Sequence, residues 1–277
     1  TGANNTAIGA TALYNNTTAS NNTAVGYQAG YSTTTGAGNT VVGYAALRSG
    51  TTVGGHTAIG FEALYNTTAA ESTAIGYQAG RSNTTGTTHV FVGLQAGYSN
   101  TTGNNLTALG YTALFANTTG SNNVAVGREA LQANTTASNN TAVGYQAGYS
   151  NTTGTTNVAI GRATLFTNTT ASYNTAVGDQ AGYYVTGGSN TYVGFYAGVG
   201  TSGSNSASNN AGFGYYALST VTSGSYNAAF GGQSLQNDTT GAYNTALGYY
   251  ALFSNTTASN NTAVGYQAGY SNQTGAS

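Results

Sequence analysis

Apolar and polar positions along the chain recur in one short unit. An aliphatic residue precedes a glycine, alanine usually stands one position further back, and an aromatic residue often follows the glycine. A polar segment rich in Asn, Thr and Gly then leads into the next unit. With this glycine as the anchor there are sixteen units, and twelve of the fifteen intervals between anchors are 17 residues. The anchors are Gly9, Gly26, Gly43, Gly60, Gly76, Gly93, Gly110, Gly127, Gly144, Gly161, Gly178, Gly194, Gly214, Gly231, Gly248 and Gly265.

This period predicts the fold. Seventeen residues are too few for the helix pairs of helical repeat proteins. Val, Ile, Thr and Tyr around a recurring glycine disfavour a helix and favour short strands joined by Gly/Asn turns. We therefore expect an all-β fold, a β-solenoid (β-roll) of about sixteen 17-residue coils with two short parallel strands per coil. The repeat covers residues 1–277, which predicts a single continuous solenoid with an irregular insertion around 187–210.

Stacked coils would align each position of the unit in a column. The position four residues before the anchor is Asn in twelve of the sixteen coils, and stacked Asn side chains can bond from coil to coil. His56 and His89 occupy the same position, and we interpret them as substitutions in this ladder rather than as metal ligands. The other members of the predicted ladder are Asn5, Asn22, Asn39, Asn123, Asn140, Asn157, Asn174, Asn190, Asn210, Asn227, Asn244 and Asn261.

Two further columns concern the surface. Side chains alternate in a strand, so Ala and the aliphatic residue before the anchor face opposite ways. We favour Ala inside, which leaves a Val/Ile column outside that needs a partner surface. The aromatic column after the anchor predicts stacked rings. A platform for sugars is the alternative, with Tyr27, Tyr77, Tyr145 and Tyr266 as its candidates.

Asn-x-Thr sequons form a further regular series in the polar segment. They indicate N-linked glycosylation of an exposed loop, or a structural turn that closes each coil through side-chain bonds to the backbone. The candidate sites are Asn66, Asn83, Asn100, Asn117, Asn134, Asn151, Asn168 and Asn255.

The amino-acid composition limits the kinds of bond and functional site that the chain can form. The chain has 277 residues, of which only nine are charged, and it has no Pro, Cys, Met or Trp. The absence of cysteine excludes disulfides, and the lack of a basic surplus excludes an electrostatic nucleic-acid-binding surface. No apolar run is long enough to span a membrane. The few acidic residues are scattered over different coils, so we expect no catalytic residues, no metal site and no cofactor. Glu62 near Arg81, and Arg128 with Glu129, predict only weak surface ion pairs.

The segments Asn-Thr-Ala-Val-Gly-Tyr-Gln-Ala at 140–147 and 261–268 carry a family resemblance. They resemble the YadA-like head repeats of trimeric autotransporter adhesins, and related repeats occur in phage tail fibres. The resemblance implies a left-handed parallel β-roll, usually trimeric, in a surface-exposed adhesive fibre. The units here are longer than that family's by an Asn-Thr-Thr-Gly type loop.

These observations predict a non-enzymatic structural component of an extracellular fibre or filament, at a cell or virion surface. Its expected partners are copies of itself, in a lateral trimer or stacked head to tail, together with covalent glycans. The alternatives are a glycan-binding adhesin or tail-fibre module, with the 187–210 insertion as its contact, and an ice-binding solenoid. The chain starts without Met, and residues 1–3 share the repeat phase of residues 274–276, so we expect a processed or partial chain that continues axially.

Overall fold

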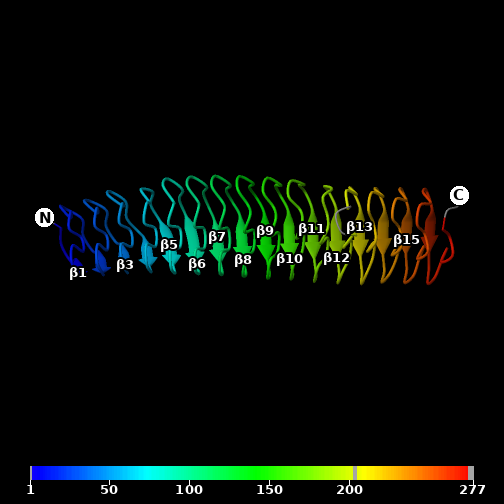
Figure 1. Cartoon of the computed structure of the whole chain (residues 1–277), viewed down its shortest axis with the longest axis horizontal. Helices are drawn as coiled ribbons and strands as arrows, with labels where there is room; N and C mark the ends of the chain where they lie inside the picture. Colours follow the sequence, from blue (N-terminus) through cyan, green and yellow to red (C-terminus); the bar gives the residue numbers. More distant parts are fainter. Residues whose placement is uncertain (1, 202–204, 274–277) are drawn as a thin grey trace. The chain divides into compact units, whose positions relative to one another are not determined.

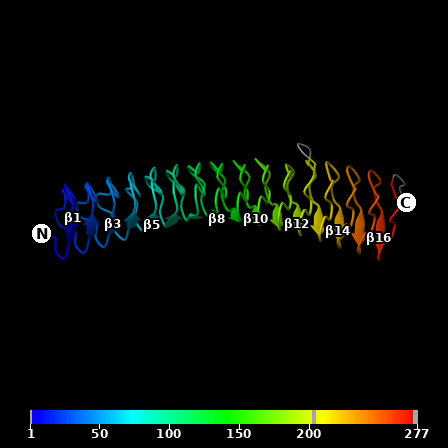
Figure 2. The same cartoon turned by 60° about the horizontal axis from the view of Figure 1, so that its bottom comes forward.

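The computed structural model describes residues 2–201 and 205–273, and within them the fold is all-β. Short parallel strands, one per repeat, build a β-solenoid with coils of about 17 residues, which confirms the predicted fold class. The chain divides into two compact units, residues 1–139 and 140–277. In Figures 1 and 2 the strands within each unit lie side by side in sequence order. The described residues include no apolar helix of the length that a bilayer crossing requires.

Within residues 2–139 the first unit holds eight strands, and successive strands of this unit pair in parallel at the repeat register, so that Thr6 lies opposite Thr23 and Ile8 opposite Val25. The strands are β1 (Thr6–Ile8), β2 (Thr23–Val25), β3 (Thr40–Val42), β4 (Thr57–Ile59), β5 (Ser72–Ile75), β6 (His89–Val92), β7 (Thr107–Leu109) and β8 (Val124–Val126).

The second unit repeats this arrangement, and Val158 of one strand lies opposite Thr175 of the next. Its strands are β9 (Thr141–Val143), β10 (Val158–Ile160), β11 (Thr175–Val177), β12 (Thr191–Val193), β13 (Ala211–Phe213), β14 (Ala228–Phe230), β15 (Thr245–Leu247) and β16 (Thr262–Val264).

The structure differs from the prediction in having one strand per coil rather than two. The segment expected to form the second strand turns through left-handed residues instead, with φ of 54° at Gln28 and 60° at Gly30. Its backbone still bonds from coil to coil, since the Gly30 amide donates to the Ala46 carbonyl at 3.0 Å. These stacked corners therefore hold the coils together without extended geometry.

The anchor glycines are required by the backbone. Gly110 has a φ of +139°, which only glycine adopts readily, and a β-carbon there would lie 2.5 Å from the carbonyl oxygen of Gly127. Gly144 meets Gly161 in the same way in the second unit. The anchors thus allow successive backbones to approach closely where the chain leaves each strand.

The interior is thin and small residues line it. The strand alanines, such as Ala58 and Ala108, are fully buried, whereas the threonine before and the aliphatic residue after each of them face outward. The column four residues after the anchor holds either Leu or Gly, and a Leu in one coil spreads over the Gly of the next. Leu13 covers Gly30 in this way, and Leu165 covers Gly182.

Two glycines in this column follow another glycine and have no leucine in the preceding coil. In both coils an aromatic residue replaces the strand alanine and fills the space: Phe91 packs against Gly97, and Tyr192 packs against Gly198. Both rings are fully buried. The coils are therefore of three kinds: those with Leu, those with Gly that depend on a preceding Leu, and those with Gly that carry their own aromatic ring.

Candidate interaction surface and interior ladders

The predicted ladder residues lie inside the coils and join successive turns. Asn22 is buried, its Oδ1 accepts the backbone N–H of Asn39 at 2.8 Å, and its Nδ2 donates to the Gly36 carbonyl at 2.9 Å. The same pattern recurs in the second unit, where the Asn157 amide donates to Asn140 Oδ1 at 2.9 Å. Each asparagine thus satisfies a buried donor and a buried acceptor of the backbone.

In both histidines a ring nitrogen takes the place of the asparagine Oδ1 as the acceptor of a backbone N–H. Nδ1 of His56 accepts the Ser72 amide at 3.2 Å, and Nδ1 of His89 accepts the Leu106 amide at 3.4 Å. Burial lowers the pKa of His89 to about 4 and lowers that of His56 as well, against the opposing effect of backbone hydrogen bonds. The neutral ring is the form that can accept these bonds.

The prediction that the sequon series lies in an exposed loop is wrong. Seven of its eight asparagines are buried, and Asn66 is half-buried because the shortened coil places Thr67 in the column instead. Asn100, for example, donates from Nδ2 to Asn83 Oδ1 at 2.8 Å. A glycan on such an amide has no room in the folded coil. The buried members are Asn83, Asn100, Asn117, Asn134, Asn151, Asn168 and Asn255.

These residues form a second interior ladder that meets the first at a shared carbonyl. The Ala137 oxygen accepts both Asn123 Nδ2, at 2.7 Å, and Asn134 Nδ2, at 3.0 Å. In the second unit the Gly154 oxygen accepts Asn140 and Asn151 in the same way. Both lone pairs of the carbonyl are then used, which explains how so polar an interior is stable.

Asp238 introduces a carboxyl group into this second ladder. It is fully buried and accepts the Gly241 amide at 3.1 Å and Asn255 Nδ2 at 3.0 Å. Burial raises the pKa of the Asp238 carboxyl to about 7, although these two hydrogen bonds act in the opposite direction. An acid at a position built for an amide is therefore readily protonated.

The outward face of the strands is the main candidate surface. We call it the strand face, and it consists of the residues three and one before each anchor, such as Thr57 and Ile59 in β4. Neither column contains a charged residue in any of the sixteen coils. Ile75 and Ile160 are each 38% exposed, and Val90 is 41% exposed. Each unit thus presents an uncharged array of mostly threonine and aliphatic side chains, to which Phe213 and Phe230 add aromatic rings in the second unit.

The aromatic column after the anchors borders the strand face. Its rings lie face to face along the stack: Tyr27 on Tyr44 with centroids 5.3 Å apart, and Phe61 on Tyr77 at 5.1 Å. Tyr145 is exposed, and Tyr266 stacks on Tyr249. Tyr27 and Tyr77 stand at the two ends of this run, so each has a ring on one face only, and the sugar platform stays a prediction.

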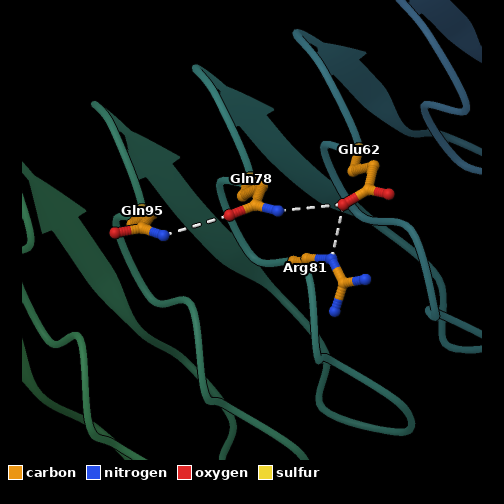
Figure 3. Close-up of polar contacts among 4 residues, drawn as sticks. All are labelled: Glu62, Gln78, Arg81 and Gln95. Carbon is orange, nitrogen blue, oxygen red and sulfur yellow. Dashed lines mark hydrogen bonds and ion pairs between the residues drawn. The ribbon is translucent and has the colours of Figure 1, made fainter.

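Glu62 and Arg81 form a small polar chain with two glutamines (Figure 3). Gln95 donates to Gln78, Gln78 donates to Glu62 at 2.9 Å, and Arg81 Nε lies 2.6 Å from the same Glu62 oxygen. Burial alone would raise the pKa of Glu62, but the bonds from Arg81 and Gln78 outweigh it and lower the pKa. The pair Arg128–Glu129 also forms, at 2.9 Å.

Arginine side chains also pack on tyrosine rings in the first unit. The Arg48 guanidinium lies 5.5 Å from the centroids of both Tyr31 and Tyr65, and Arg81 lies 5.3 Å from Tyr65. Such cation–π contacts stabilise the exposed edge of the coils modestly. They leave the arginines engaged with their own unit.

Within residues 2–201 and 205–273 we find no cavity and no group of three or more side chains that could hold a metal ion. The irregular insertion keeps the interior column intact, since Asn205 is buried and bridges to Val185. Residues 202–204 of that insertion, together with residues 1 and 274–276 of the predicted terminal phase match, lie outside the described residues.

A scan of the chain against protein-family models finds no match, and a search of curated proteins finds no relative. The adhesin-head resemblance therefore rests on the repeat motif alone and remains a prediction.

Proposed function

We propose that the protein is a non-enzymatic structural component of an extracellular fibre, in which copies of the chain associate laterally through the strand face. The observation that supports this most strongly is the uncharged character of that face over every coil. Charged side chains are the usual means by which an exposed sheet avoids association. Their absence from this face favours contact with another protein surface.

A second copy of the chain is the partner that fits best. The strand face repeats at the spacing of stacked strands, so another solenoid with the same spacing can oppose each coil with an equivalent one. Aliphatic side chains such as Ile59 and Ile75 would then be removed from water along the length of the contact. A lateral trimer, as expected from the sequence, would use the same contact.

The test is the mass of the intact chain in solution, measured by light scattering or sedimentation. We expect a species heavier than the 27.6 kDa monomer. The double variant Ile59→Lys, Ile75→Lys places two charges on the strand face and should shift the protein towards the monomer. Thr85→Lys, Thr102→Lys places the same charges on exposed positions of the polar segment and should leave the mass unchanged. A wild-type chain that is monomeric at every concentration contradicts the proposal.

The threonines of the strand face favour ice binding as a second candidate. Thr107 and Thr57 lie on strands, two residues from an outward aliphatic side chain, so hydroxyl and methyl groups alternate across a regular face. Thermal hysteresis of a monomeric preparation, abolished by Ile59→Lys, Ile75→Lys, would favour this function over fibre assembly.

A further inference from the structure

A set of asparagines outside the buried series also begins sequons. Asn21, Asn105 and Asn139 stand five residues before an anchor, and each is followed two residues later by a strand threonine. All three are exposed, in contrast to the buried series. We propose that this column, and not the interior one, carries N-linked glycans. The proposal does not depend on the proposed function.

The backbone presents these side chains at a fixed corner. Asn105 has a φ of 55° and Asn21 a φ of 59°, the left-handed conformation that asparagine tolerates well. The Asn105 amide donates to the Thr87 carbonyl at 3.0 Å, which ties the corner to the preceding coil. The side chain therefore leaves the coil at its surface, where a sugar does not displace any interior group.

The hydrogen bonds of the column are compatible with glycosylation. Asn105 donates from Nδ2 to Asn122 Oδ1 at 3.0 Å, and Asn122 donates to Asn139 Oδ1 at 3.3 Å. A side-chain amide has two N–H groups, and attachment of a sugar replaces only one of them. The bond from Asn105 to Asn122 can thus persist in the glycosylated chain.

The third residue of each sequon is also accessible. Thr23 is exposed and Thr107 is half-buried on the outward side of its strand. The acceptor asparagine and the hydroxyl residue that the sequon requires are then both at the surface. In the interior series the asparagine itself is enclosed.

Spacing supports the same assignment. Asn122 lies between Asn105 and Asn139, but Val124 replaces its threonine, so the sequons occur on alternate coils here. Two coils span roughly 10 Å, twice the separation of neighbouring strands. Sugars at this distance are less crowded than sugars on every coil of the buried series.

The test is secretion of the full chain from a host whose N-glycosylation is verified with a reference glycoprotein. Site occupancy would be read by mass spectrometry after enzymatic deglycosylation in heavy-oxygen water. We expect sugar on Asn21, Asn105 and Asn139. Thr107→Val should remove the glycan at Asn105 alone, and valine is accommodated at the same position in β8.

Two further variants test the assignment: one adds a sequon to the exposed column, and the other removes a buried sequon as a control. Val124→Thr completes the sequon at Asn122 and should add a glycan in chains that do not already carry sugar at both Asn105 and Asn139, whereas Asn117→Gln should remove none because Asn117 is buried. A secreted, folded chain without sugar at Asn21 and Asn105 overturns the proposal. Sugar found on Asn117 in the folded chain overturns it as well.

Discussion

The ring of Phe91 occupies the space that a β-carbon on Gly97 would need, and both residues belong to the same coil. The ring also fills the space beside Gly80 in the preceding coil. One large side chain therefore compensates for two glycines, in a column where leucine is the alternative residue.

Phe91→Ala should create a cavity and lower the free energy of unfolding by about 3–5 kcal/mol. Val90→Ala, on the exposed side of the same strand, should cost much less. Adding Gly97→Leu to Phe91→Ala should recover part of the loss, since leucine adopts a φ near 50° at this position in other coils. Denaturant unfolding monitored by circular dichroism measures all three. Equal losses for Phe91→Ala and Val90→Ala would contradict the packing described.

Gly110→Ala should destabilise the first unit more than an ordinary glycine substitution. It forces an unfavourable φ, worth about 1–3 kcal/mol, and places a β-carbon against the Gly127 carbonyl. Gly265→Ala is the matched control, because Gly265 is also an anchor with a φ of +127°, but only the Ala268 side chain lies within 4 Å of its β-carbon position, at 3.9 Å. Thermal unfolding of both variants separates the conformational cost from the steric cost. A Gly265→Ala loss as large as that of Gly110→Ala would argue against a steric cost from the close backbone approach.

His89 should make the first unit sensitive to acid. Its pKa falls from 6.5 to about 4 on folding, so the unfolded chain binds the proton more readily. The stabilisation is complete above pH 6.5 and is lost progressively as the pH falls towards 4. His89→Asn restores the common ladder residue and should flatten this part of the profile. Hydrogen exchange in β6 and β7 at pH 4.5 and pH 7 is the measurement, and identical pH profiles for wild type and variant would exclude this role.

Asp238 should make the second unit less stable as the pH rises, which is the opposite pH dependence to that of His89. Its pKa rises from 3.8 to about 7 on folding, so the folded chain holds the proton more tightly. The associated stability is complete below pH 4 and decreases as the pH rises to 7. Asp238→Asn should remove this dependence and stabilise the chain above pH 7 by up to about 4 kcal/mol. Urea unfolding at pH 5 and pH 8 tests this, and a destabilised variant at pH 8 would be the contrary result.

The sequence contained enough information for the fold and for the first ladder. The recurring anchor set the coil length, and the position of His56 among asparagines indicated a column with one hydrogen-bonding role. The reason for glycine at the anchor is the close approach of the Gly110 and Gly127 backbones. The sequence shows only that glycine recurs there and does not reveal this approach.

The second ladder was misplaced for a physical reason. Asn-Thr-Thr-Gly has the composition of an exposed turn, and only the left-handed corners that precede it direct Asn100 and its equivalents inward. A signal was nevertheless present, because Val185 and Val221 occupy the same column and are both buried. The prediction of a second strand was wrong for a related reason. Residues such as Gln28 and Leu47 adopt a positive φ, which is unusual for these residue types and cannot be recognised from the sequence.

The three kinds of coil also limit how such an array can change length during evolution. A coil that carries its own aromatic ring, or a leucine coil that is followed by another leucine coil, can be duplicated or lost alone without opening a void. A coil such as that of Gly30 or Gly182 cannot follow every neighbour, because its interior is completed by the leucine before it. Recombination that preserves packing should therefore move these coils in pairs, with the leucine coil first.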